Sequence, residues 1–312
     1  MQVADYVQYG FPLLSSAPKV SVLAPNHVSF SIGLDKQLQN IKDELKSGRI
    51  AGPYKFPPFW PFRLIKMGSV SKKHSDKRRP TTDASFPTAI SPNDNTTLRS
   101  FPHLNNPRFS DLVYTLLHCY LFWGSLSPKS AKLDIEQAYR NLCLLVRDLW
   151  QQCFAVGDEI FINLRLTFGS TSSVSHFSRF SRGLTHVLQH HFDSTSIRIP
   201  ASPGNPTEEE LLHAPIWVLT MMDDFLFVSP TQARTQYAVD YASDLFHSLN
   251  VPVNQRKKAE EGTPSHICTF QGLQFNSESR EILVPPDKLE RTRLALAHYV
   301  SSTVDPTRSQ VE

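Results

Sequence analysis

The spacing of apolar and polar positions predicts several amphipathic helices. Leu34, Leu38, Ile41 and Leu45 recur at helical intervals with polar residues between them, and Gly48 follows as a stop signal. Residues 1–33 show no clear period and are predicted to be an irregular extension. Similar patterns predict four further helices, over residues 109–123, from Phe177 to His191, from Pro230 to about Leu249, and over residues 287–300.

Strand patterns alternate with these helices. Apolar runs predict strands over residues 64–70 and 131–135, and residues 149–166 read as a hairpin across a Gly157-Asp158 turn. A further strand pair is predicted at 266–275 and 282–284. The stretch 48–62 is rich in proline and glycine, which excludes a helix, and we predict a loop clamped by its aromatic side chains.

The stretch Trp217–Val228, WVLTMMDDFLFV, stands out because two apolar runs flank an acidic pair. This pattern predicts a hairpin with Asp223 and Asp224 at or beside the turn. One interpretation is that aspartate is simply a good turn residue. The other is a metal site, because two adjacent, partly desolvated carboxylates repel each other and a divalent cation such as Mg²⁺ removes that repulsion. A metal site needs a third carboxylate, and Asp134 at the end of strand 131–135 fits best.

Composition narrows the class of protein only a little. The 312 residues are 40% hydrophobic, enough for one large or two ordinary domains, and the net charge of +3 permits a nucleic-acid partner without indicating one. The four cysteines form no CxxC pair, so neither a zinc site nor a disulfide framework is predicted. No signal peptide or membrane-spanning run is evident, so we expect an intracellular protein, cytoplasmic or nuclear, with no membrane partner.

Positive charge is concentrated in residues 71–80, SKKHSDKRRP. The segment is predicted to be the basic tip of a hairpin, in which five cations within eight residues meet a single acid. Such a tip suits contacts with phosphate groups, although a solvated charged face is an equally good interpretation.

Eight motifs, taken in chain order, resemble those of reverse transcriptases of retroelements, closest to the DIRS-like (tyrosine-recombinase) group. Each motif alone is weak, but together they span roughly residues 34–300. They are GRIAGPYKFPPF at 48–59, KRRPTTDASFP at 77–87, SPNDN at 91–95, KLDIEQAYRNL at 132–142, LTFG at 166–169, MMDDFLFV at 221–228, TFQGLQF at 269–275 and VPPDKL at 284–289.

The resemblance implies an α+β, right-hand polymerase fold. It implies an N-terminal extension at 1–33, mainly fingers at 34–130, mainly palm at 131–285 and the start of a truncated thumb at 286–312. The implied function is that of a retrotransposon RNA-directed DNA polymerase, which adds deoxynucleoside triphosphates to a primer 3′-hydroxyl over an RNA or DNA template. Two Mg²⁺ (or Mn²⁺) ions would serve as cofactors for this transfer.

Residue roles follow from the resemblance, motif by motif. Asp134 and Asp223 match the principal metal ligands, and Asp224 matches the second aspartate of the acidic hairpin. Tyr139 matches an aromatic residue that lies against the sugar and would reject a 2′-hydroxyl by steric clash. The remaining matches are Lys72 or Lys73, Arg79, Phe168, Gly169 and Lys258 (or Lys257) for the incoming nucleotide and its pyrophosphate, and Met221, Met222 and Gly272 for primer and template.

Two positions depart from the family pattern. Met221 stands where tyrosine is usual, and Thr167 stands where proline is usual. These departures keep open a catalytically decayed or repurposed module that binds nucleic acid, whereas Tyr139 argues against an RNA-dependent RNA polymerase. The polymerase interpretation requires that Asp134 converge with the acidic doublet and not be buried against a permanent cation of the chain itself. The sequence does not predict an oligomeric state.

Overall fold

The structure is a computed structural model that describes residues 2–71, 78–97, 106–124 and 127–301. The chain divides into two compact units. Unit 1 comprises residues 1–105 and 135–184, and unit 2 comprises residues 106–134 and 185–312. The units interleave along the sequence, whereas the predicted fingers, palm and thumb follow one another, so those three names remain a prediction.

The helices of unit 1 are α1 (Gln2–Tyr9), α2 (Val28–Ser31) and α3 (Leu34–Lys46). Helix α3 confirms the first predicted helix. Helices α1 and α2 show that the prediction of an irregular extension over residues 1–33 was wrong near both of its ends. A helix of eight residues has little stability of its own, and α1 is held by tertiary contacts, because the Tyr6 ring packs against the rings of Phe11 and His176.

Unit 1 contains two antiparallel sheets. One has the strand order β1-β6-β5, from β1 (Ile50–Tyr54), β6 (Glu159–Asn163) and β5 (Cys153–Val156), and the other pairs β2 (Lys66–Ser71) with β3 (Arg78–Asp83). Both predicted hairpins are therefore present. The loop predicted over residues 48–62 was wrong for β1, which contains Pro53. Proline lacks an N–H donor but is tolerated on an edge strand such as β1.

The main core of unit 1 lies between α3 and these strands. It contains Ile41 from α3, Ile50 from β1, Met67 from β2 and the stacked pair Phe154–Phe161 from β5 and β6. Two 3₁₀ helices, η2 (Ala138–Asn141) and η3 (Val146–Gln151), complete the unit.

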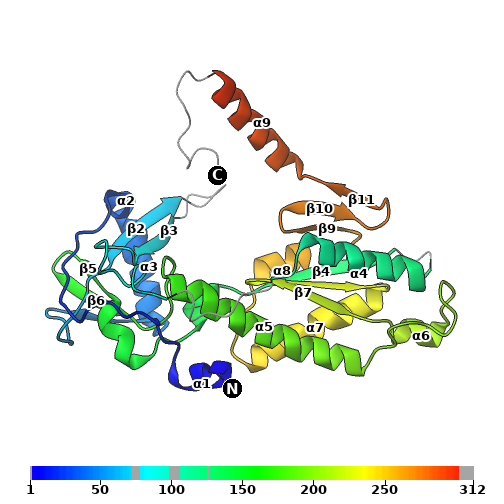
Figure 1. Cartoon of the computed structure of the whole chain (residues 1–312), viewed down its shortest axis with the longest axis horizontal. Coiled ribbons are helices and arrows are strands. Elements are labelled where there is room, and N and C mark those ends of the chain that lie inside the picture. The colour runs from blue at the N-terminus through cyan, green and yellow to red at the C-terminus, as the bar shows by residue number, and fades with distance from the viewer. Residues whose placement is uncertain (1, 72–77, 98–105, 125–126, 302–312) are drawn as a thin grey trace. The chain divides into compact units, whose positions relative to one another are not determined.

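The central sheet of unit 2 has the order β4-β8-β7, from β4 (Lys129–Asp134), β8 (Asp224–Ser229) and β7 (Trp217–Met221). Helices α4 (Phe109–Phe122) and α7 (Gln232–Ser248) cover opposite faces of the sheet (Figure 1). Both faces of β8 are consequently buried, which explains the unbroken apolar run Phe225–Val228 within it. Leu226 packs into the cluster that includes Leu116 of α4, while the Phe225 ring contacts Phe246 of α7.

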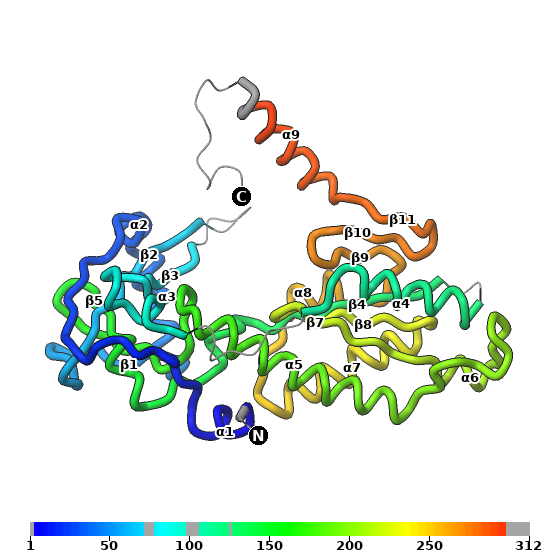
Figure 2. Tube along the Cα trace, viewed as in Figure 1, coloured from blue at the N-terminus to red at the C-terminus, as the bar shows by residue number. Residues whose placement is uncertain are grey.

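Further helices and a second sheet belong wholly or partly to unit 2 (Figure 2). Helix α5 (Thr171–Ser194) begins in unit 1 and ends in unit 2, and it is followed by α6 (Glu208–Leu212), α8 (Gln255–Glu261) and α9 (Pro286–Ser301). Strands β9 (Ile267–Phe270), β10 (Leu273–Asn276) and β11 (Glu281–Leu283) form a second sheet.

Two sequence predictions in this region need correction. The single strand predicted over 266–275 is a hairpin, because Gln271 and Gly272 take positive φ angles of 49° and 85° and form its turn. Helix α8 was not predicted. In the part of the chain that the structure describes, every helix is too short or too polar to serve as a membrane span.

Candidate active site

Strand pairing brings the three aspartates together at one end of the central sheet of unit 2. Asp134 is the last residue of β4 and is the cross-strand partner of Asp224, the first residue of β8. Met221 pairs with Asp224, so Met222 and Asp223 form a two-residue turn between β7 and β8. The early acid and the later doublet thus meet at adjacent strand ends.

The turn requires an unusual backbone at Met222, whose φ angle is 58°. A non-glycine residue in this left-handed region costs roughly 1 kcal/mol or more. The β7–β8 ladder and the packing of Met221 against the unit 2 core hold the turn in place. Asp223 is consequently fixed at the tip of the hairpin.

Burial and mutual repulsion act on the hairpin carboxylates. Burial, followed by repulsion from Asp134, raises the pKa of Asp223 to about 6. Burial also raises the pKa of Asp224, although Lys132 and Lys257 oppose the increase. The Oδ1 atom of Asp224 is buried and makes no hydrogen bond within the described residues.

Two lysines of the chain supply positive charge at this site. The Nζ atom of Lys257 donates a hydrogen bond to Oδ2 of Asp134 and lies 3.7 Å from Oδ1 of Asp224. The Nζ atom of Lys132 lies 3.9 Å from the same Oδ1 and 3.0 Å from a carboxylate oxygen of Glu261. Burial opposes the charge on Lys257, but its bond to Asp134 and the nearby acids raise its pKa.

The donor set matches a divalent cation in its chemistry, since carboxylate oxygens suit Mg²⁺ and Mn²⁺ and one of them has no hydrogen-bond partner. The arrangement differs from a formed metal site, because the Lys257 ammonium lies against Asp134. Among the described residues, no group of three or more histidines, cysteines or acids is arranged to hold a metal ion. Asp134 is therefore beside the doublet and also buried against a cation of the chain, but that cation is not sealed in place, because the Lys257 side chain is 35% exposed.

Asn254 explains why Lys257 reaches the carboxylates. Asn254 caps α8, because its side-chain oxygen accepts a hydrogen bond from the backbone N–H of Lys257 at 3.2 Å. Its own backbone N–H donates to the carbonyl of Asp134 at 2.8 Å, and its side-chain amide donates to Oδ1 of Asp134 at 3.3 Å. The resemblance named Lys258 first, but the residue at the carboxylates is Lys257. Reading Asn254 as a helix cap would have placed Lys257 in the first turn of α8.

A second group of predicted residues lies in unit 1. The Tyr139 ring, in η2, makes edge-to-face contacts with Phe168 at 4.9 Å and with Phe177 at 5.6 Å between ring centroids. Phe168 is 44% exposed, so one side of this pair faces solvent. Gly169 has a φ angle of 100°, and a Cβ atom there would lie 1.9 Å from the carbonyl oxygen of Thr82.

Two neighbouring arginines on strand β3, Arg78 and Arg79, have different surroundings. Arg78 donates hydrogen bonds to Ser69 and Ser71 on β2, so its guanidinium holds the hairpin together. Arg79 is exposed, and successive side chains of a strand point to opposite faces. Arg79 is therefore the more exposed of the two arginines, and its predicted contact with the triphosphate stays a prediction. The predicted Lys72 and Lys73 lie outside the described residues.

Sequence reasoning assigned no role to Asn93 of the SPNDN motif. Its side-chain amide donates to the carbonyl of Gly169 at 2.8 Å, and its side-chain oxygen accepts from the backbone N–H of Thr171 at 2.9 Å. Asn93 thus fixes the loop that carries Phe168. In unit 2, Gly272 lies in the β9–β10 turn, where its carbonyl accepts a hydrogen bond from Lys288 at 3.2 Å.

Comparisons with known proteins identify the fold. No family model and no curated protein matches the sequence. Among solved structures, the chain is similar to the foamy viral protease-reverse transcriptase dRH in complex with double-stranded DNA, with a TM-score of 0.61 and 13% identity over 96% of this chain and 42% of that one. It is also similar to the foamy viral protease-reverse transcriptase in complex with an RNA/DNA hybrid, with a TM-score of 0.55 and 13% identity over 96% of this chain and 32% of that one.

A third similar structure is a mutant of the prototype foamy virus protease-reverse transcriptase, with a TM-score of 0.57 and 14% identity over 96% of this chain and 34% of that one. The chain spans less than half the length of these three structures. It has a reverse-transcriptase-like fold, and the predicted mixture of helices and antiparallel sheets is confirmed at that level.

Proposed function

We propose that this chain is the polymerase part of a retrotransposon reverse transcriptase, of the DIRS-like group, and that it transfers nucleotides to a primer 3′-hydroxyl. The observation that carries the proposal is the cross-strand pairing of Asp134 with Asp224 beside Asp223, in a reverse-transcriptase-like fold. Convergent carboxylates at this point are what metal-assisted phosphoryl displacement needs.

Each residue has a role in the proposed reaction. Asp134, Asp223 and Asp224 would hold Mg²⁺ or Mn²⁺, which when bound activates the attacking hydroxyl and stabilises the charge of the leaving group. Lys257, already beside these carboxylates, offers positive charge for the pyrophosphate. By the motif resemblance, Tyr139 would contact the sugar of a deoxynucleotide and Arg79 its triphosphate. Complexes of the similar structures with double-stranded DNA and an RNA/DNA hybrid support a primer–template as the partner.

A second candidate is a module that binds nucleic acid without catalysis. The contact between Lys257 and Asp134 favours it, since a lysine in place of a metal ion neutralises the acids with no chemical consequence. Met221 in place of the usual tyrosine points the same way. This candidate predicts salt-sensitive binding to a primer–template, because phosphate contacts release counterions, and no nucleotide incorporation.

Primer extension separates the two candidates. The chain is incubated with a primed homopolymer, labelled deoxynucleoside triphosphate and either Mg²⁺ or Mn²⁺. We expect extension by the unaltered protein, its loss in Asp223→Asn, and full activity in Asp244→Asn, a matched change at an exposed position of α7. If the unaltered protein binds the duplex but extends nothing with either metal, the polymerase proposal fails and the binding module stands.

A further inference from the structure

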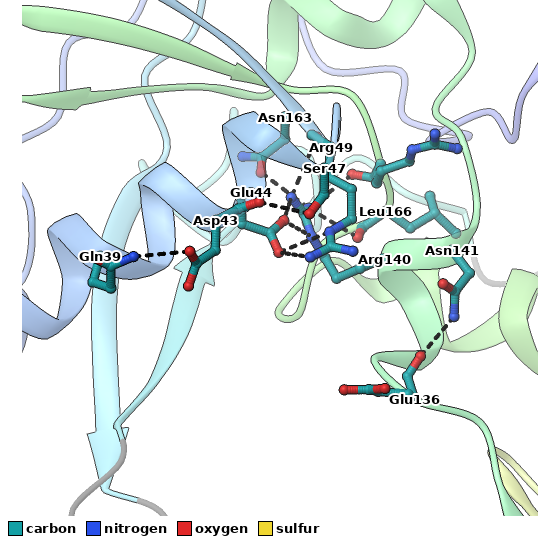
Figure 3. A network of polar contacts seen from close by, with 11 residues as sticks. Gln39, Asp43, Glu44, Ser47, Arg49, Glu136, Arg140, Asn141, Asn163 and Leu166 are labelled. Carbon is teal, nitrogen blue, oxygen red and sulfur yellow. Dashed lines mark hydrogen bonds and ion pairs between the residues drawn. The ribbon is translucent and has the colours of Figure 1, made fainter. Parts of the chain in front are cut away.

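Arg140 is a buried arginine that follows the predicted sugar-contacting Tyr139 directly in η2. Its guanidinium donates to Oε2 of Glu44 through Nε at 2.9 Å and through Nη2 at 2.5 Å, and to Oδ1 of Asn163 at 3.1 Å (Figure 3). The side chain is only 10% exposed. A planar fork that binds one carboxylate through two nitrogens fixes orientation as well as charge.

The same guanidinium reaches the chain just before the loop that carries Phe168. Its Nη1 atom donates to the carbonyl of Arg165 at 3.4 Å and to that of Leu166 at 3.3 Å, two residues before Phe168 (Figure 3). Arg140 therefore joins η2, which presents Tyr139, to the segment that presents Phe168. The two rings lie 4.9 Å apart between centroids.

Glu44 of α3 is the fixed point of this cluster. Burial works against its negative charge, but Arg140 and Arg49 outweigh that effect and lower its pKa. Arg49 binds the other carboxylate oxygen, Oε1, through Nε at 2.9 Å and Nη2 at 2.8 Å. The side chains of Arg49 and Arg140 thus hold opposite edges of one carboxylate. Of these two side chains, only that of Arg140 is bonded to residues 165 and 166 among the described contacts, whereas Arg49 meets this segment through its backbone carbonyl, which accepts from the N–H of Leu164 at 2.9 Å.

We propose that Arg140, oriented by Glu44, is a positioning residue that sets the sugar specificity of the nucleotide site through the Tyr139–Phe168 pair. This inference rests on the proposed polymerase function. A fork that sets the spacing of both rings would keep Tyr139 where a 2′-hydroxyl clashes. Lysine keeps the charge of Arg140 but, as a single point donor, cannot bind Glu44 and the carbonyls of Arg165 and Leu166 together.

The test compares Arg140→Lys with Arg49→Lys, which alters the same ion cluster but keeps the backbone bond between residue 49 and Leu164. The first readout is the ratio of kcat/KM for a deoxynucleotide to that for the matching ribonucleotide. We expect Arg140→Lys to lower this ratio about tenfold, in the direction of Tyr139→Ala, because a small misplacement of a positioning group costs one to two orders of magnitude. Arg49→Lys should keep the ratio of the unaltered protein.

The second readout does not need activity. Hydrogen exchange of residues 138–142 and 166–169 should become faster in Arg140→Lys and stay unchanged in Arg49→Lys. An unchanged nucleotide ratio in an active protein, or equal exchange in the two variants, overturns the inference and leaves the polymerase proposal intact. If the unaltered protein extends no primer, the assignment to sugar specificity falls with the polymerase proposal, and the exchange experiment alone decides whether Arg140 positions the two rings.

Discussion

At the scale of single residues, Lys257 bears directly on the proposed metal site. The ammonium would compete with a divalent cation for the same carboxylates, since Lys257 contacts both Asp134 and Asp224. We expect Lys257→Gln to bind Mn²⁺ about tenfold more tightly, because a unit charge about 4 Å away is worth roughly 1 to 4 kcal/mol. Electron paramagnetic resonance of free Mn²⁺ measures this affinity without nucleotide. Lys258→Gln is the control, and equal affinities in the two variants would show that Lys257 does not compete.

His176 makes the stability of unit 1 depend on pH. The imidazole is fully buried, and its Nε2 atom donates to the carbonyl of Pro12 at 2.6 Å. Burial, which is only partly offset by this hydrogen bond, lowers the pKa of His176 to about 4. The folded state therefore favours the neutral ring, so its stabilising effect is complete above pH 6.5 and is lost as the pH falls towards 4.

The expected loss is at most about 3 kcal/mol in the free energy of unfolding between pH 6.5 and pH 4. His176→Phe should remove this part of the pH dependence. Urea unfolding at several pH values between 7 and 4 measures it. His190→Gln, at an exposed position of α5, should keep the slope of the unaltered protein. If His176→Phe retains the same slope, the imidazole is not buried in its neutral form.

At the scale of elements, the close contact between β3 and the Phe168 loop depends on a glycine. The carbonyl of Phe168 accepts a hydrogen bond from the backbone N–H of Thr82 at 3.3 Å, and Gly169 has no room for a Cβ atom. Gly169→Ala should destabilise unit 1 by about 2 kcal/mol or more in urea unfolding, because the chain must move and the φ angle is unfavourable for alanine.

Gly183 offers the opposite case within α5. Apart from its chain neighbours and the backbone of its own helix, no described atom lies within 4 Å of a Cβ built there, so Gly183→Ala should stabilise the helix by roughly 0.5 to 1 kcal/mol. For the Gly169 prediction, a Gly169→Ala variant as stable as the unaltered protein would contradict the close approach of residue 169 to the Thr82 carbonyl.

Elements with a strong internal pattern could be predicted from the sequence, and elements held by distant contacts could not. The sequence of α3 has apolar residues at helical intervals, and the β7–β8 hairpin has two apolar runs on either side of an acidic pair. Strand β1 was missed because Pro53 and its glycine neighbour hide a strand that exists through pairing with β6. The candidate site divides in the same way. Asp134 and the doublet lie at predicted strand ends, whereas the contact of Lys257 depends on α8 meeting the end of β4.

At the scale of the whole molecule, each compact unit has a hydrophobic core of its own. Phe154 stacks on Phe161 in unit 1, and Phe246 packs against Phe225 in unit 2. Phe154→Ala and Phe246→Ala should each cost about 3 to 5 kcal/mol. Hydrogen exchange should show the loss of protection mainly in the unit that carries the change. Equal losses in both units for either variant would mean that the chain unfolds as one cooperative body.

The pairing of β4 with β8 indicates a way in which the site formed by the three aspartates can lose its activity. Successive side chains of a strand alternate between faces, so one residue removed between Lys129 and Asp134 would turn the terminal acid to the other side of the sheet. Every aspartate codon would survive in such a copy, and so would most of the fold. Such a copy would still contain all three aspartates, and a comparison of those residues alone would not reveal its inactivation. Deletions and insertions within β4 are therefore as informative about loss of activity as substitutions at the aspartates.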